Sequence, residues 1–214
     1  SRMFIREGTK VRIDDLMKGI IIQSGNDASV AIAEHSGGSE GAFADVMNQQ
    51  AVLLGMNDTQ YQNATGLPNE DHYTTAADLA KLTTALIKNF PEHYSLYGEK
   101  YFSYNDIRQP NRNLLLWRDK SVDGVKTGHT DSAGYCLVSS ALRDDMRLIS
   151  VVMGASSEEA RATESQKLLS YGFRYFETLR LYKADETLRT VKVWGGQTDR
   201  LDLGLAEAVV LTAV

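Results

Sequence analysis

Cysteine is nearly absent from this sequence of 214 residues, and long apolar runs are absent too. A single cysteine, Cys136, excludes a disulfide within the chain and leaves its redox compartment open. No apolar run approaches the ~20 residues needed to span a bilayer. The 28 acidic residues outnumber the 23 basic ones. The resulting net charge of −5 excludes a general nucleic-acid binder, which needs a basic surface. With 43% hydrophobic and 24% charged residues, the composition is typical of a globular protein.

The chain also lacks repeats, low-complexity segments and the pattern of a signal peptide. It opens on Ser1-Arg2-Met3-Phe4, without a charged stretch followed by an apolar one. A strand and a turn are expected over residues 4–11, so the sequence reads as if it begins in mid-structure.

Apolar residues recur at helical spacing through the first half of the chain. We expect helices over residues 16–22, 28–35, 40–54 and 76–89. The residues before them can serve as caps: Asp14 or Asp15, Asn26-Asp27, Ser39 and Thr74-Thr75.

The second half changes character. Alternating apolar residues predict strands over 122–126, 134–142 and 147–154, the last two joined as a hairpin at Asp144-Asp145. One long helix is expected from 158 to 179. Short β-rich pieces follow at 188–194 and 208–214, and this tail is too short to bury a core alone.

Two short motifs occur at the ends of these expected helices and strands. Ser24-Gly25-Asn26 closes an apolar helical run, and Lys126-Thr127-Gly128-His129 ends an expected strand. Ser-x-Asn alone is weak, since it occurs about once in two chains of this length. Lys-Thr-Gly is rarer, roughly one chain in twenty by chance. No lysine has a serine three residues before it, so the sequence contains no Ser-x-x-Lys.

With these motifs, several segments resemble the low-molecular-mass penicillin-binding proteins of Gram-negative bacteria, the D-alanyl-D-alanine carboxypeptidases of types five and six. The segments are Leu114-Leu115-Leu116-Trp117, Val122 to Thr130, Arg147-Leu148-Ile149-Ser150 and Tyr171 to Glu177. The resemblance implies an α/β (α+β) fold of the serine β-lactamase/transpeptidase type, an antiparallel sheet flanked by helices. It places a carboxypeptidase domain at residues 1–178 and the beginning of a small β-rich domain at 179–214. We expect the start of the first domain, most of the second and a membrane anchor to be missing.

The resemblance also implies the chemistry. A serine from the absent Ser-x-x-Lys attacks the peptide bond of a D-Ala-D-Ala terminus, D-alanine leaves, and water hydrolyses the acyl-enzyme. Ser24 would pass a proton to the leaving amine, and Lys126 would lower the energy of the anionic states. Asn26 would hydrogen-bond the acyl-side amide.

The remaining positions would bind substrate. The Thr127 hydroxyl would contact the terminal carboxylate, and the backbone N–H of His129, after Gly128, would form half of an oxyanion hole. Arg161 resembles the family's carboxylate-orienting arginine and Arg112 a second basic residue. No cofactor or metal is implied, since no His/Cys/Asp cluster has ligand spacing.

Structural explanations remain open for each residue taken alone. Ser24 and Asn26 are ordinary helix caps, Lys126 a solvated strand end, and Arg161 a surface residue placed unfavourably for the helix dipole. Cys136 is expected to be a small buried hydrophobic residue.

Three functions therefore stay open. The first is a carboxypeptidase acting on peptidoglycan pentapeptides ending in D-Ala-D-Ala and inhibited by β-lactam antibiotics. It would be periplasmic and held at the inner membrane by an anchor outside this chain. The second is a serine β-lactamase of the same fold, and the third a non-catalytic peptidoglycan-binding module. An upstream Ser-x-x-Lys would exclude the third.

Overall fold

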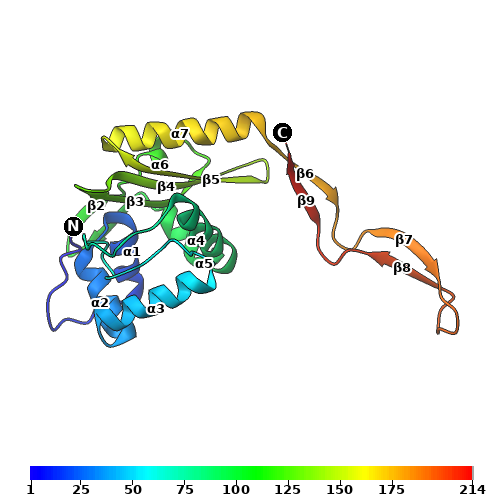
Figure 1. Ribbon diagram of the computed structural model, residues 1–214, viewed down its shortest axis with the longest axis horizontal. Coiled ribbons are helices and arrows are strands. Elements are labelled where there is room, and N and C mark those ends of the chain that lie inside the picture. The colour runs from blue at the N-terminus through cyan, green and yellow to red at the C-terminus, as the bar shows by residue number, and fades with distance from the viewer. Residues whose placement is uncertain (214) are drawn as a thin grey trace.

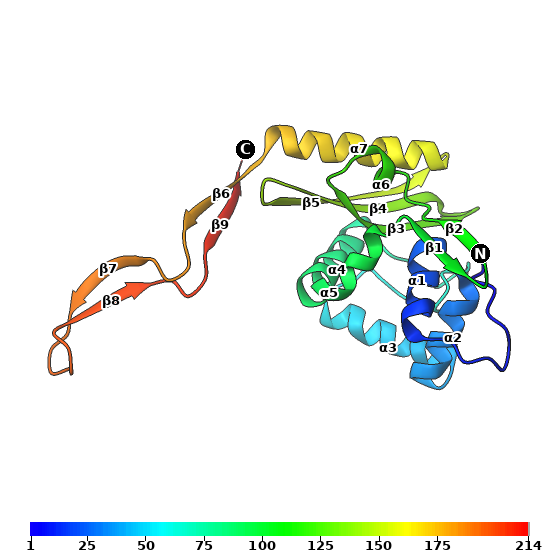
Figure 2. The ribbon, with the colours of Figure 1, turned by 180° about the vertical axis from the view of Figure 1, so that it is seen from behind.

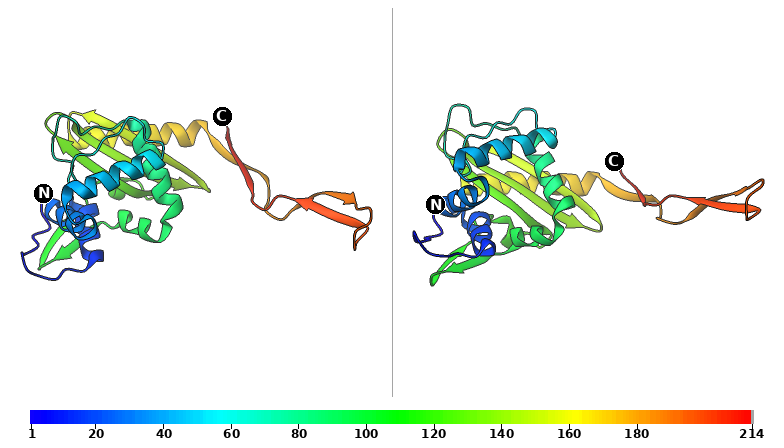
Figure 3. Two further views of the ribbon diagram at one scale, coloured as in Figure 1. Left: turned by 60° about the horizontal axis from the view of Figure 1, so that its bottom comes forward. Right: turned by 90° about the horizontal axis from the view of Figure 1, so that it is seen from below.

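The computed structural model describes residues 1–213, which form a layered body and an extended arm (Figure 1). A sheet occupies the middle of the body, one long helix covers one face, and a group of helices covers the other (Figures 1 and 3). The helices are α1 (Ile13–Gln23), α2 (Asn26–Gly37), α3 (Glu40–Leu53), α4 (Ala76–Asn89), α5 (Pro91–Tyr94), η1 (Ser95–Gly98), α6 (Leu115–Arg118) and α7 (Glu158–Tyr175). Within the described residues, no helix combines the length and apolar character that crossing a membrane requires.

Two of the four predicted helix caps are confirmed, and the one at Asn26-Asp27 is wrong, because Gly25 is the N-cap of α2 and both residues lie inside the helix. Ser39 and Thr75 accept hydrogen bonds from the third backbone N–H that follows them, at 3.1 and 3.2 Å. The cap expected at Asp14 or Asp15 is wrong, because α1 begins at Ile13 and both aspartates lie in its first turn. There they favour the helix through its dipole instead.

Three antiparallel strands form the main sheet in the order β3-β4-β5. They are β3 (Val122–Thr130), β4 (Gly134–Arg143) and β5 (Met146–Ala155). The predicted hairpin is confirmed, since Asp144 and Asp145 take the positive φ angles of 45° and 65° that a tight turn requires. A smaller two-stranded sheet pairs β1 (Tyr101–Tyr104) with β2 (Ile107–Pro110).

Strand alternation gives the main sheet two apolar faces. Leu137 is buried in the core shared with Ala162 and Leu169 of α7. The next residue, Val138, is buried on the other face with Tyr94 of α5. Each such side chain contributes about 1.5–3 kcal/mol when fully buried. The two cores fix the sheet between α7 and the helical group.

Two further sequence predictions are wrong, one near the N-terminus and one at the end of the long helix. The segment 4–11 contains a turn but no strand, and Asp27 holds it by accepting the backbone N–H groups of Met3 and Phe4 at 2.8 Å. The long helix ends at Tyr175, not at 179. Leu179 belongs instead to β6 (Glu177–Tyr182), where it pairs with Leu211 of β9 (Val209–Ala213).

The arm consists of two paired ribbons that extend away from the body (Figures 1 and 2). Strand β6 pairs with β9, and β7 (Thr187–Lys192) pairs with β8 (Arg200–Gly204). Many of its apolar side chains are exposed, including Leu181, Leu201 and Trp194. The described arm therefore has no packed core of its own, as its length predicts.

Candidate active site

The junction of α1 and α2 presents Ser24 and Asn26 to the sheet. Ser24 follows the last residue of α1 in the left-handed conformation, with φ 57°, and Asn26 begins α2. Gly25 between them packs against the N-terminal segment, where a Cβ would lie 3.2 Å from both the Cβ and the backbone N of Met3. The tight approach explains glycine at this position, and the left-handed conformation of Ser24 turns the chain between the two helices.

Strand β3 brings Lys126 to the same place. Its Nζ donates a hydrogen bond to Ser24 Oγ, across 102 residues of sequence, and another to the carbonyl of Thr127 at 2.9 Å. The two motifs that the sequence analysis singled out are therefore in direct contact.

Lys126 is electrostatically unusual. Burial, followed by the like charges of Arg112 and Arg161, lowers the pKa of Lys126 to about 8. No carboxylate forms an ion pair with its ammonium group in the described chain. A lysine in this state is suited to stabilising negative charge and exchanging protons near neutral pH.

Arg161 is buried at the start of α7, where Ser157 caps the helix. Its Nη1 donates to the carbonyl of Gly128 at 3.2 Å, and its guanidinium lies 5.5 Å from the centre of the Tyr135 ring. Glu158 Oε1 is 3.7 Å from Nη2, which has no hydrogen-bond partner within residues 1–213. The sequence left open that Arg161 is a surface residue. That alternative is wrong, because the side chain is buried and its guanidinium reaches inward to β3.

All of the sequence-predicted residues line one pocket of about 480 Å³: Ser24, Asn26, Arg112, Lys126, Thr127, Gly128, His129 and Arg161. Glu158 is the one acidic side chain among the described lining residues, against three cationic ones. A recessed site with this charge balance concentrates anions.

Part of the pocket wall is a loop that the sequence motifs do not indicate. Thr65, Gly66 and Leu67 line the pocket from the connection between α3 and α4. Asn63 folds this loop, since its Oδ1 accepts the N–H groups of Thr65 and Gly66 at 3.1 and 2.8 Å. Such Asx turns are a common use of asparagine, but nothing local in the sequence indicates which surface the turn faces.

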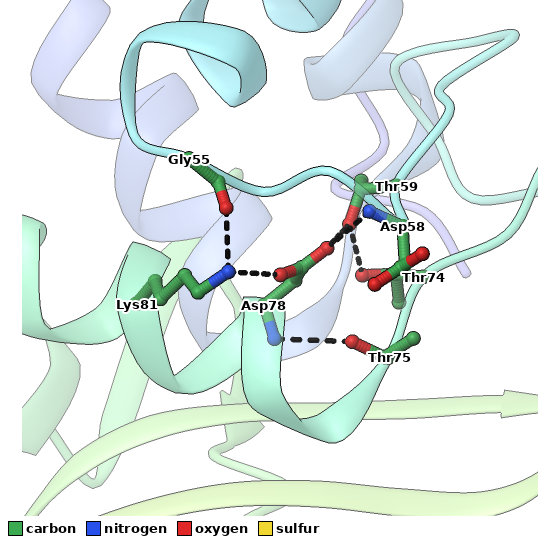
Figure 4. Close-up of polar contacts among 7 residues, drawn as sticks. All are labelled: Gly55, Asp58, Thr59, Thr74, Thr75, Asp78 and Lys81. Atoms are coloured by element: carbon green, nitrogen blue, oxygen red, sulfur yellow. Dashed lines mark hydrogen bonds and ion pairs between the residues drawn. The ribbon is translucent and has the colours of Figure 1, made fainter.

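A buried carboxylate anchors both ends of that connection (Figure 4). Asp78, only 1% exposed, accepts the N–H of Asp58 and the hydroxyl of Thr59, both at 2.9 Å. Lys81 donates to Asp78 Oδ1 at 2.8 Å and also to the carbonyl of Gly55 (Figure 4). The Lys81 hydrogen bond is the largest of the causes that hold the pKa of Asp78 below its ordinary value. The network fixes where the loop leaves α3 and joins α4.

Two further pocket residues come from β4. The Tyr135 ring packs against the His129 ring at a tilt of 35°, with centroids 4.0 Å apart, and the Arg161 guanidinium lies over the Tyr135 ring. Cys136 is half-buried and lines the pocket, so the expectation of a small buried core residue is wrong. The alternation of β4 predicts that consecutive side chains point to opposite faces of the sheet. It does not predict that Tyr135 and Cys136 lie beside the two motifs.

Comparison with known proteins decides the family. A family described as D-alanyl-D-alanine carboxypeptidase, peptidase S11, matches residues 1–157. The chain belongs to this family.

Relatives support that assignment along the whole chain. The D-alanyl-D-alanine carboxypeptidase DacC of Escherichia coli (strain K12) is 49% identical over 213 residues, covering 99% of this chain and 53% of that protein. Penicillin binding protein 5 from Haemophilus influenzae superposes with a TM-score of 0.89 at 42% identity, covering 99% of this chain and 62% of that structure. A Listeria monocytogenes penicillin-binding protein in its cefotaxime-bound form gives a TM-score of 0.73 at 30% identity, covering 80% and 71%. The chain spans about half the length of the curated relatives it matches.

Membership of the carboxypeptidase family agrees with the fold. The antiparallel sheet between helical layers is the β-lactamase/transpeptidase arrangement that the sequence resemblance predicted, and that prediction is confirmed.

Proposed function

We propose that this chain is part of a serine D-Ala-D-Ala carboxypeptidase, which trims the terminal D-alanine from peptidoglycan stem peptides. The observation that carries the proposal is the contact between Lys126 and Ser24, in a pocket where cations outnumber carboxylates. The substrate ends in a carboxylate, which is anionic at neutral pH. The names of the relatives point to the same reaction.

The proposed roles follow from position. The family's nucleophilic serine, from a Ser-x-x-Lys that this sequence does not contain, attacks the carbonyl carbon of the scissile bond. Ser24 relays a proton to the leaving amine, and the Lys126 ammonium stabilises the negative charge on the reacting oxygen atoms. Asn26 hydrogen-bonds the acyl-side amide.

Residues at the edge of β3 and next to it in the pocket are proposed to bind the substrate. Thr127 and Arg161 hold the terminal carboxylate, and Arg112 adds positive charge from the pocket rim. Gly128 gives the substrate backbone room to approach, and the N–H of His129 supplies half of the oxyanion hole. β-Lactam antibiotics, which present a carboxylate and an acylating carbonyl, are proposed to bind the same pocket. The cefotaxime-bound relative supports this.

We further propose that residues 1–178 belong to the carboxypeptidase domain and that 179–214 begin a second, β-rich domain. The exposed apolar side chains of the arm support a second unit that packs against them. A peptidoglycan substrate places the protein outside the cytoplasm, in the periplasm, and we propose an inner-membrane anchor beyond this chain.

The experiment measures D-alanine release from a peptide ending in D-Ala-D-Ala, by a polypeptide that joins these residues to the family's Ser-x-x-Lys. Lys126→Ala should depress the acylation rate by orders of magnitude, at least about 10²-fold, while thermal unfolding changes little. Lys120→Ala, an exposed lysine outside the pocket, is the control. Near-normal turnover in Lys126→Ala would remove this lysine from the mechanism. Rapid release of hydrolysed penicillin would instead favour a β-lactamase.

A further inference from the structure

The pocket contains a free thiol that the proposed reaction does not use. Cys136 on β4 is half-buried and lines the same pocket as Ser24 and Lys126. Its thiol donates hydrogen bonds to the carbonyls of Ala133, at 3.5 Å, and Gly134, at 3.9 Å. A thiol is a weak donor, so these bonds do not prevent the sulfur from reacting.

Gly128 leaves this thiol uncovered on the pocket side. Gly128 and Cys136 are direct partners in the β3–β4 register, so their side-chain positions share one face of the sheet. A Cβ at position 128 would lie 3.8 Å from the Cβ of Cys136. Because glycine has no such atom, a small molecule in the pocket can approach the sulfur past this position.

A second observation indicates what kind of molecule the pocket would hold there. Arg161 is 2% exposed, and its Nη1 binds the carbonyl of Gly128, the residue opposite the thiol. Its Nη2 has no hydrogen-bond partner within residues 1–213, and the nearest charge partner, Glu158, is 3.7 Å away. An anionic oxygen would satisfy this donor. Lys126 and Arg112 add positive charge to the same pocket.

We propose that Cys136 is a covalent modification site for small anionic disulfides and thiosulfonates. The Cys136 thiolate attacks one sulfur of the reagent, a new bond forms to Cys136, and the original bond to that sulfur breaks. The leaving thiolate or sulfinate takes the electron pair, and the thiol proton passes to solvent. The reagent is thereby reduced as Cys136 is oxidised. The site goes beyond the proposed peptidase function and does not depend on it.

The test compares two reagents of similar size and opposite charge, on the natural polypeptide that contains these residues. These are 2-sulfonatoethyl and 2-(trimethylammonio)ethyl methanethiosulfonate, and each rate is divided by that reagent's rate with a small free thiol in the same buffer. Peptide mass spectrometry should find an adduct on Cys136, absent in Cys136→Ser. The normalised rate at Cys136 should be higher for the anionic reagent, by about tenfold or more at low salt.

Three variants separate the causes. Arg112 is an exposed cation of the pocket, so Arg112→Gln should reduce the preference for the anionic reagent. Lys120 is exposed outside the pocket, so Lys120→Gln should leave that preference unchanged. Gly128→Ala adds a methyl group at an ordinary contact distance and should slow both reagents. Two results would overturn the proposal: labelling of Cys136 only after unfolding in urea, or equal normalised rates for the two reagents. D-Alanine release enters none of these readouts.

Discussion

The depressed pKa of Lys126 makes a quantitative prediction about pH. With a pKa of about 8, Lys126 is roughly nine-tenths protonated at pH 7 and about one-tenth at pH 9. If its positive charge stabilises the acylation transition state, kcat/KM should fall about tenfold between these values. An ordinary lysine would hold its rate to nearly pH 10.

Removing one of the causes should move the titration. Arg112→Gln deletes a like charge, so the pKa of Lys126 rises, and the alkaline limb of the profile moves to higher pH. It should not reach the ordinary value of 10.5, because burial is the largest cause and is unchanged. Arg112 is also proposed to bind substrate, but lost binding lowers the plateau of the profile, whereas a changed pKa moves its midpoint.

The assay is the pH dependence of kcat/KM for D-alanine release by a polypeptide that includes the nucleophilic serine. NMR titration of ¹³C-labelled lysine checks the pKa independently of activity, and Lys120→Gln is the control of equal charge change. A rate that stays flat to pH 10, or an alkaline limb unmoved by Arg112→Gln, would refute the electrostatic argument.

Two further predictions concern the chain itself and the wall of the pocket. A polypeptide of these 214 residues alone should neither cleave D-Ala-D-Ala peptides nor form a covalent penicillin adduct, because it contains no Ser-x-x-Lys. The measurement is intact mass spectrometry after incubation with penicillin, and a stable adduct would contradict the prediction. Asp78→Asn should lower the urea midpoint at pH 7, and the difference from the parent should shrink below about pH 4. A carboxyl group with a depressed pKa stabilises the fold above its unfolded pKa, and that stability is lost as pH falls through the folded value. Asp45→Asn, at an exposed position on α3, is the control, and an equal effect of both substitutions would refute the role of the Asp78 network.

The sequence predicts the parts of this molecule that depend on local patterns. Helix periodicity identifies α2, periodicity together with capping residues identifies α3 and α4, and the motifs identify Ser24 and Lys126 as partners. The end of α7 is missed because Leu179 fits either a helical or a strand period, and only pairing with Leu211 decides between them. Tyr135, Cys136 and the loop at 65–67 reach the pocket through tertiary contacts, which no local pattern encodes.

Arg161 offers a test of how the site tells a free carboxyl terminus from an amide. The Thr127 hydroxyl can donate one hydrogen bond to the substrate carboxylate, but a hydroxyl alone discriminates weakly. Arg161 is better placed to discriminate, since Nη1 is fixed on the carbonyl of Gly128 and Nη2 has no hydrogen-bond partner in the described chain. A charge-assisted hydrogen bond from Nη2 to the carboxylate contributes about 1–3 kcal/mol, roughly 5- to 150-fold in kcat/KM.

In the polypeptide that carries the nucleophile, Arg161→Ala should therefore weaken use of the carboxylate peptide by that factor and use of its C-terminal amide far less. The measured quantity is the ratio of kcat/KM for the two peptides in mutant and parent. Because Arg161 is buried, the substitution also risks unfolding some molecules, but that loss affects both substrates equally and cancels in the ratio. Arg161→Lys should retain part of the preference, since it keeps the charge and loses the planar pair of donors. An equal loss for both peptides would mean that Arg161 supports the β3–α7 packing and does not read the terminus.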